Sequence, residues 1–286
     1  KQKTAYEIRN CDWSSDVCSS DLDGGVGWTA GSGSSFSVTA GSYSTGQVQV
    51  RQTDRAGNVS APYTSFAAFT VDTTAPSVTS VSTSGTGITA GAGYLKAGAV
   101  VTITVNTSEA VTISGGTPSL SLSSGGTATY TGGSGSTALV FSYTVGATDN
   151  SADLTITALN NNSATLTDAA GNAFASFSNN PAGTLVIDTV APNAPAITSV
   201  TDDVAPLTGS LTAPAFTNDT NLTVRVSLSG TNAVAGDTIQ LCNGSAALGS
   251  AYTITATDFS NGYANLQTGT LDRKSTRLNS SHSSVS

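Results

Sequence analysis

A pair of short motifs occurs twice in this chain at a nearly constant spacing, and this repetition constrains the fold more than any other feature. Thr53–Asn58 (TDRAGN) is followed by Val71–Pro76 (VDTTAP), and Thr167–Asn172 (TDAAGN) is followed by Ile187–Pro192 (IDTVAP). The first motif recurs after 168 − 54 = 114 residues and the second after 188 − 72 = 116 residues. A period of this length corresponds to one domain, so the chain is predicted to consist of tandem domains.

The two ends of the chain differ from the middle and resemble translated sequencing-adapter DNA. Residues 12–22 (DWSSDVCSSDL) match the translation of one strand of a common short-read adapter, and residues 272–281 (DRKSTRLNSS) match the other strand. Lys1–Ile8 resembles the upstream part of the same adapter. We therefore expect residues 1–22 and 272–286 to be disordered artefacts of sequence assembly, and fold reasoning leaves them out. Because the chain has no Met, residues 23–271 are expected to be an internal fragment of a longer protein.

The composition of residues 23–271 restricts what they can bind. They contain four Lys and Arg against thirteen Asp and Glu, a net charge of −9. This charge disfavours nucleic acid as a partner, because a phosphate backbone would meet a negative surface. Cys242 is the one thiol of this region, which excludes an internal disulfide and a cysteine-based zinc site. No apolar run is long enough to span a bilayer.

Short runs of alternating apolar and polar residues, separated by glycine-rich turns, indicate β-strands. Between the two motif copies such runs occupy residues 101–105, 120–122, 139–145, 154–158 and 185–187. About seven short strands in a domain of about 115 residues are typical of an immunoglobulin-like β-sandwich. No window shows helical periodicity. The predicted fold class is therefore all-β, with tandem immunoglobulin-like β-sandwiches.

The motif positions also predict the domain boundaries. Residues 23–74 are expected to be the C-terminal half of a domain, closed by a hairpin of strands at 47–52 and 66–71. Residues 75–189 form one complete domain. Residues 190–271 begin a third domain, with strands at 222–228, 239–241 and 252–256, and end before any TD-x-AGN turn. The third domain should therefore lack its last strands and keep an open sheet edge, so that only 75–189 is expected to be well folded by itself.

The paired motifs and the strand-rich stretch 101–156 resemble the bacterial Ig-like repeats of large surface adhesins and biofilm-associated proteins. Asp237–Gly244 also resembles a strand of these repeats, with Cys242 in place of the usual aromatic residue. The resemblance covers residues 23–271. It implies an array of β-sandwiches secreted to the bacterial cell surface, neighbouring repeats as partners, a role in cell adhesion and often Ca²⁺ at the domain junctions. The host, glycan or matrix partner stays unidentified.

Aspartates at the predicted junctions are the candidate Ca²⁺ ligands. Ca²⁺ takes six to eight oxygen ligands at about 2.3–2.6 Å, so carboxylates must converge. The junction positions, the TD-x-AGN turns and the start of the third domain together supply Asp54, Asp72, Asp168, Asp188, Asp202 and Asp203. The alternative is structural, since an aspartate in a turn often accepts hydrogen bonds from the following backbone and one at a strand end can cap it. For a second acidic group, Asp149, Asn150 and Asp153, a solvated turn is favoured.

Residues 23–271 contain few side chains able to act in catalysis, so we expect that they are not an enzyme. The only histidine, His282, lies in the adapter-like end, so no triad or general base of that kind remains. Cys242 is expected to be an inert, semi-buried thiol. Glu109 has no evident carboxylate partner for glycoside hydrolysis. An isopeptide bond would need Lys96 close to Glu109 and buried, whereas Lys96 lies among small loop residues.

The predicted function is therefore a non-catalytic stalk that projects a distant binding domain from the cell. One alternative is that the repeats themselves bind glycan or protein, although most aromatic residues (Phe36, Tyr43, Tyr63, Phe141 and Tyr143) fall at core-facing positions and Trp28 is the exception. Another is an accessory module of a secreted hydrolase.

Overall fold

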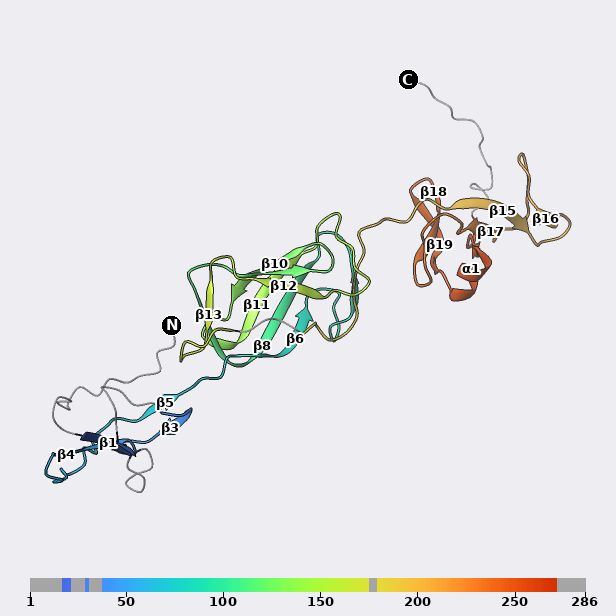
Figure 1. Cartoon of the computed structure of the whole chain (residues 1–286). Helices are drawn as coiled ribbons and strands as arrows, with labels where there is room; N and C mark the ends of the chain where they lie inside the picture. The colour runs from blue at the N-terminus through green and yellow to red at the C-terminus, as the bar shows by residue number, and fades with distance from the viewer. Residues whose placement is uncertain (1–16, 22–28, 31–37, 175–178, 272–286) are drawn as a thin grey trace. The chain divides into compact units, whose positions relative to one another are not determined.

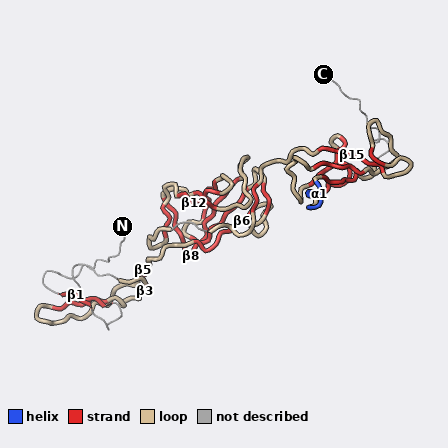
Figure 2. The backbone as a smooth tube through the Cα atoms, turned by 45° about the vertical axis from the view of Figure 1, so that its right-hand side comes forward, coloured by secondary structure: helices blue, strands red, loops and turns tan. Residues whose placement is uncertain are grey.

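The chain folds into β-structure throughout the part that the structure, a computed structural model, describes: residues 17–21, 29–30, 38–174 and 179–271 (Figure 1). The strands pair antiparallel with one exception, and one short helix accompanies them in these ranges (Figure 2). Two compact units, Lys1–Thr189 and Val190–Ser286, make up the chain. Their division falls where the sequence places the second domain boundary. Among the described helices, none has the length and hydrophobicity needed to cross a membrane.

The first strands of the first unit form two small sheets. In one, β1 (Val17–Asp21) lies between β2 (Thr29–Ala30) and β4 (Gln49–Thr53), and in the other β3 (Gly41–Tyr43) pairs with β5 (Phe69–Val71). Strand β1 belongs to the adapter-like end, so the structure differs there from the expected disorder. An exposed strand edge offers unpaired N–H and C=O groups to any extended segment, and β4 supplies such an edge. Residues 1–16, 22–28 and 272–286 lie outside the described ranges.

The chain after β4 does not form the regular hairpin that the sequence predicted. Beyond the turn at Asp54–Asn58, isolated bridges join it to β4 between Thr53 and Val59 and between Val50 and Tyr63, and the Ser60 N–H donates to the Gln52 carbonyl. Proline at position 62 has no N–H to donate to a ladder. The next strand, β5, pairs with β3 and not with β4.

A long strand, β8 (Val100–Ser114), organises residues 75–189. It pairs with β6 (Val78–Ser84) and β11 (Ser136–Thr144), and its last residues pair with β13 (Thr165–Thr167). The sheet continues from β11 in the order β10 (Thr127–Gly132), β9 (Ser119–Leu122) and β12 (Ile156–Asn160). The chain leaves through β14 (Leu185–Ile187), which pairs in parallel with β7 (Gly93–Leu95).

The alternating runs supply the core of this region as predicted. Val101, Ile103 and Val105 of β8 are fully buried, and Phe141 and Tyr143 of β11 are 1 % exposed. They pack in one cluster with apolar side chains of the neighbouring strands and of the exit strand β14. Burial of this continuous apolar face is the main contribution that holds the sheet together.

The second unit has a smaller core. Strand β17 (Thr223–Ser227) lies between β15 (Ala196–Asp202) and β20 (Tyr263–Gln267), and β15 also pairs with β16 (Gly209–Ser210). A separate hairpin joins β18 (Thr238–Asn243) and β19 (Ala246–Thr253). The side chains of β17 that the sequence predicted to point inward are buried. The core cluster of the second unit consists of Val224, Val226, Leu241, Ala264 and Leu266.

A short helix, α1 (Ala256–Asn261), replaces the end of the strand predicted at 252–256. Thr255 and Asp258 form a capping box, in which Thr255 Oγ1 accepts a hydrogen bond from the Asp258 N–H and the Asp258 carboxylate accepts one from the Thr255 N–H. Tyr252 also donates to this carboxylate at 2.7 Å. The hydrogen bonds from Thr255, and then from Tyr252, hold the pKa of Asp258 below its usual value. Local capping therefore outweighs the alternation that predicted a strand.

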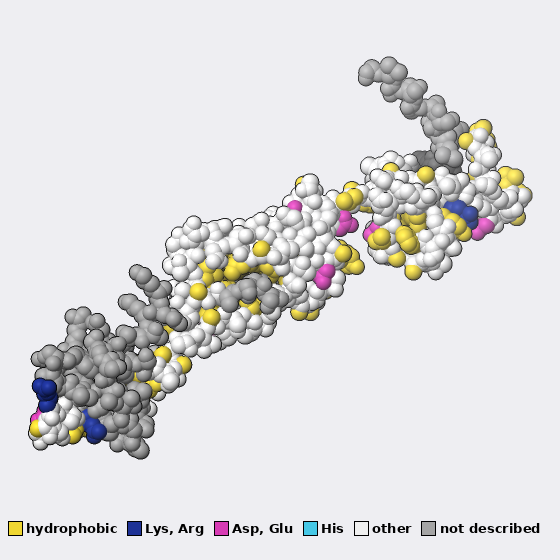
Figure 3. Space-filling view, in the orientation of Figure 1, with side chains coloured by type: hydrophobic (Ala, Val, Ile, Leu, Met, Phe, Trp, Pro, Cys, Tyr) yellow, Lys and Arg dark blue, Asp and Glu magenta, His cyan; other side chains and the backbone are white. Residues whose placement is uncertain are grey.

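Charged side chains are sparse on the surface of the described residues, as the space-filling view in Figure 3 shows for one face. Backbone atoms and side chains that are neither charged nor hydrophobic cover most of the visible surface of residues 75–189, around a patch of hydrophobic side chains. The few carboxylates that come together are therefore conspicuous against a nearly neutral background.

Candidate metal centre

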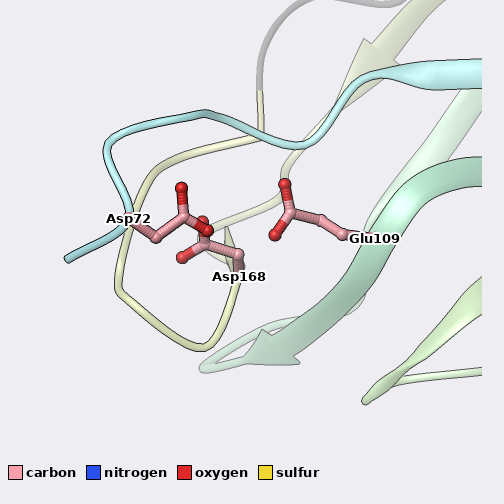
Figure 4. Close-up of side chains that lie close together, drawn as sticks. All are labelled: Asp72, Glu109 and Asp168. Atoms are coloured by element: carbon pink, nitrogen blue, oxygen red, sulfur yellow. The ribbon is translucent and has the colours of Figure 1, made fainter. Parts of the chain in front are cut away.

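Three carboxylates converge where the chain passes from the first motif copy into residues 75–189 (Figure 4). Asp72 follows β5, Glu109 lies in β8, and Asp168 follows β13. One ligand oxygen from each lies within 4.8 Å of the others, and in Figure 4 the three carboxylates point toward one another. Asp168 is 4 % exposed, while Asp72 and Glu109 are half-buried.

The TDAAGN turn fixes the position of Asp168. Its Oδ1 accepts a hydrogen bond from the Asn172 N–H at 2.8 Å, and its Oδ2 accepts one from Asn172 Nδ2 at 2.7 Å. The Asp168 N–H in turn donates to the Asn172 carbonyl at 3.1 Å. Burial favours a higher pKa for Asp168, but the hydrogen bonds from Asn172 and from the Gly171 and Ala170 backbone outweigh it and lower the pKa. Asp168 is therefore held as a carboxylate.

Glu109 has the opposite electrostatic environment. Desolvation is the largest cause that raises the pKa of Glu109, and the negative charges of Asp72 and Asp168 raise it further. Within the described residues, no Lys or Arg forms a salt bridge with any of the three carboxylates. Their mutual repulsion is therefore not relieved by the protein's own cations.

The segment between β5 and β6 runs directly beside these carboxylates. Asn172 Nδ2 donates to the carbonyl oxygens of Asp72 at 3.1 Å and Thr74 at 3.3 Å. Three residues after Thr74, Ser77 exchanges hydrogen bonds with Ser108. The Ser108 N–H donates to the Ser77 carbonyl at 2.8 Å, and the Ser77 N–H donates to Ser108 Oγ at 3.0 Å. Pro76 between them is buried.

The structure brings together two of the six predicted metal ligands, Asp72 and Asp168. Asp54 occupies the same place in the first TD-x-AGN turn, but it is exposed and its carboxylate accepts hydrogen bonds from Ala56 and Asn58 of its own turn. Asp188 is also exposed, and its N–H donates to the Leu95 carbonyl at 2.9 Å. Neither joins a group of three or more potential ligands in the described part of the chain.

The other two predicted ligands belong to the second unit. Asp202 is 1 % exposed, and its two carboxylate oxygens accept hydrogen bonds from the Val204 N–H at 2.8 Å and from Thr217 Oγ1 at 2.5 Å. The side chain of Asp203 is exposed. These two hydrogen bonds hold the loop that follows β15.

Glu109 was not among the metal ligands predicted from the sequence. Its predicted alternatives were glycoside hydrolysis and an isopeptide bond with Lys96. Lys96 is exposed and precedes β8, whereas Glu109 lies ten residues into that strand. At roughly 3.3 Å per residue the strand separates them by about 30 Å. The available signal was that Glu109 is the only glutamate of residues 23–271, although nothing in the sequence pairs it with the turn at Asp168.

The second acidic group has a structural role. Asp149 Oδ2 accepts hydrogen bonds from Tyr143 Oη at 2.7 Å and from the Gly146 N–H at 2.9 Å. Burial, and then the hydrogen bond and charge of Asp149, raise the pKa of Tyr143 to about 12, against an opposing hydrogen bond with Ser124. Asp153 Oδ1 instead accepts from the Leu185 N–H at 3.1 Å. These residues tie a loop to the core and to the exit strand.

The remaining candidates are placed as follows. Cys242 is exposed and not semi-buried, because it alternates with the buried Leu241 on β18. Tyr43, Phe141 and Tyr143 are buried as predicted, whereas Tyr63 is 52 % exposed. Trp28 and Phe36 lie outside the described residues.

No protein-family model matches this chain, and no curated protein or solved structure matches it. The geometry of the three carboxylates is therefore the feature that bears on function. Two ligand oxygens on opposite sides of a Ca²⁺ ion are about 4.6–5.2 Å apart, because each Ca–O bond is about 2.3–2.6 Å long. The spacing of the three carboxylates suits such a cation.

Proposed function

We propose that residues 23–271 are immunoglobulin-like repeats of a bacterial surface or secreted adhesin and serve as a non-catalytic stalk in which Ca²⁺ stiffens the repeat junction at Asp72. The observation that supports this proposal is the convergence of carboxylates from two successive repeats. Asp72 ends the first repeat, whereas Glu109 and Asp168 belong to the next one. A cation bound by all three would join the repeats across their connecting segment.

The three residues fit Ca²⁺ in their chemistry. Ca²⁺ prefers carboxylate and carbonyl oxygens, and the site supplies three carboxylates without a salt bridge to any Lys or Arg in the described ranges. Two of them raise the pKa of the third. Asp72, Glu109 and Asp168 would hold the ion, which would supply the positive charge that relieves this repulsion.

A stalk gains from this arrangement because separate domains move relative to one another unless their junction is restrained. Pro76 already restricts the backbone beside the junction. A bound cation would add a contact that depends on the high Ca²⁺ concentration outside cells. Weak extracellular sites have Kd values of about 10⁻⁴–10⁻³ M.

Calorimetric unfolding of the full chain with 10 mM Ca²⁺ and with chelator tests the metal site. For a Kd of about 10⁻⁴ M, ligand excess adds about 2.7 kcal/mol to the stability of the binding state. A domain of this size should then melt several degrees higher. Mg²⁺ should have a smaller effect, because it requires closer octahedral coordination.

Glu109→Gln should remove most of this Ca²⁺-dependent gain, since it replaces one ligand carboxylate by a neutral amide of similar size. Asp54→Asn is the matched control, because Asp54 has the same turn but stands apart from the other carboxylates, and it should keep the full gain. An identical melting temperature of the unmodified chain in Ca²⁺ and in chelator would remove the metal from the proposal.

A further inference from the structure

The polar side of the junction contains a second recognition device that does not require a cation. Asn172 Nδ2 lies within 2.7–3.3 Å of three acceptors: the Asp168 carboxylate and the carbonyls of Asp72 and Thr74. In the first motif copy, Asn58 makes the same contact to its own aspartate at 2.7 Å. The turn therefore holds the amide in place through Asp168, and the donated hydrogen bonds to the connecting segment are additional.

We propose that the Asp168–Asn172 turn, together with Ser108, is a receptor for the exit segment of the preceding repeat and that it recognises the backbone of that segment. Every hydrogen bond that Asn172 and the Ser108 N–H make to the segment ends on a carbonyl oxygen, of Asp72, Thr74 or Ser77. Pro76 is buried beside them. The partner that fits this surface is an extended segment whose carbonyls lie as those of Asp72, Thr74 and Ser77 do, with a proline at the position of Pro76.

Backbone recognition explains which positions of the exit segment differ between its two copies. Val71–Pro76 and Ile187–Pro192 share the aspartate, the following threonine, the alanine and the proline. They differ at the first position and at the fourth, where Thr74 corresponds to Val190. The Thr74 side chain is exposed, and Asn172 contacts only its carbonyl oxygen. One receptor surface therefore accepts either copy, and repeats with different exit segments can follow one another.

Limited proteolysis of the full chain with proteinase K, in chelator, tests this receptor. The ratio of cleavage within residues 72–77 to cleavage within 100–145 is read by mass spectrometry. Asn172 Nδ2 has two N–H groups and Asp168 accepts one of them, so the carbonyls of Asp72 and Thr74 share the other. Asn172→Ala removes this donor from the segment at a cost of about 1 kcal/mol, so the ratio should rise about fivefold. Asn58→Ala, in the copy without these contacts, should leave the ratio unchanged.

A double substitution, Val71→Ile with Thr74→Val, converts the first exit segment into the second and should also leave the ratio unchanged. If the double substitution raised the cleavage ratio as much as Asn172→Ala does, recognition of the segment through its backbone would be wrong. Cleavage that rises in parallel at 72–77 and at 100–145 in Asn172→Ala would show that Asn172 supports only its own repeat. Because chelator removes Ca²⁺, the proteolysis does not depend on the metal site. The Ca²⁺ proposal is tested separately, by calorimetry.

Discussion

The two copies of the TD-x-AGN turn have the same internal structure and different surroundings. The asparagine N–H donates to the aspartate Oδ1 at 2.8 Å in both copies, and its side-chain amide donates to Oδ2 at 2.7 Å in both. The glycine before the asparagine has φ +92° in one turn and +94° in the other. Yet Asp54 is exposed, while Asp168 is 4 % exposed.

This difference comes from what lies beside each turn. Asp168 faces Asp72 and Glu109, and Asn172 also donates hydrogen bonds to carbonyls of the segment 72–77. The described residues around Asp54 offer it no corresponding group of carboxylates. The same motif is therefore a plain turn in one copy and part of a group of three carboxylates in the other, because that group includes residues far from the turn along the chain.

Replacing the aspartate should give the largest difference in stability between the two copies of the turn. Asp168→Ala leaves the half-buried N–H groups of Asn172 without their acceptor, and we expect the free energy of unfolding of residues 75–189 to fall by about 2 kcal/mol. Asp54→Ala removes an exposed carboxylate and should change that transition little. Calorimetry of the full chain in chelator measures both, and equal losses would show that burial of the second copy adds nothing.

Replacing the glycine should instead affect both copies equally. Gly57 and Gly171 have positive φ, and an added Cβ would meet no atom within 4 Å at either position. Alanine then costs backbone strain alone, about 1 kcal/mol. Hydrogen exchange of the Asp54 and Asp168 amides, which donate to the asparagine carbonyls at 2.9 and 3.1 Å, should accelerate about fivefold in each variant. A clearly larger effect in Gly171→Ala would mean that the neighbouring repeat strains the turn.

The smallest expected effect concerns the repulsion at Glu109 without metal. Its pKa is raised in the folded state from an ordinary value of 4.5, so the ionised carboxylate opposes folding, and this cost appears as the pH rises above 4.5. In chelator, Glu109→Gln should therefore melt slightly above the unmodified chain at pH 7, and the difference should disappear near pH 4. Melting curves at both pH values check this, with Asp54→Asn as a variant outside the cluster. If Glu109→Gln were less stable than the unmodified chain at pH 7, the carboxylate of Glu109 would not oppose folding.

Much of the β-structure could be predicted from the sequence because burial follows alternation. Val101, Ile103 and Val105 point inward as their spacing requires. The strand predicted through Ala256 failed where the Thr255–Asp258 capping box supplied a stronger local signal. The pairing of β1 with β4 could not be predicted either, since an open edge accepts a segment by its backbone and its side chains leave no pattern.

The sequence by itself determined the repeat, the two turns with their hydrogen bonds, the alternating core strands and the low charge. Each of these depends on residues that are neighbours along the chain or on composition. Only the tertiary structure decided that Glu109 completes a group with Asp72 and Asp168, that Asp188, Asp202 and Asp203 stay outside it, and that Asn172 reaches the connecting segment. These contacts join residues 37 to 100 positions apart, and the packing of β8 beside β13 and the connecting segment, which no local pattern encodes, brings them together.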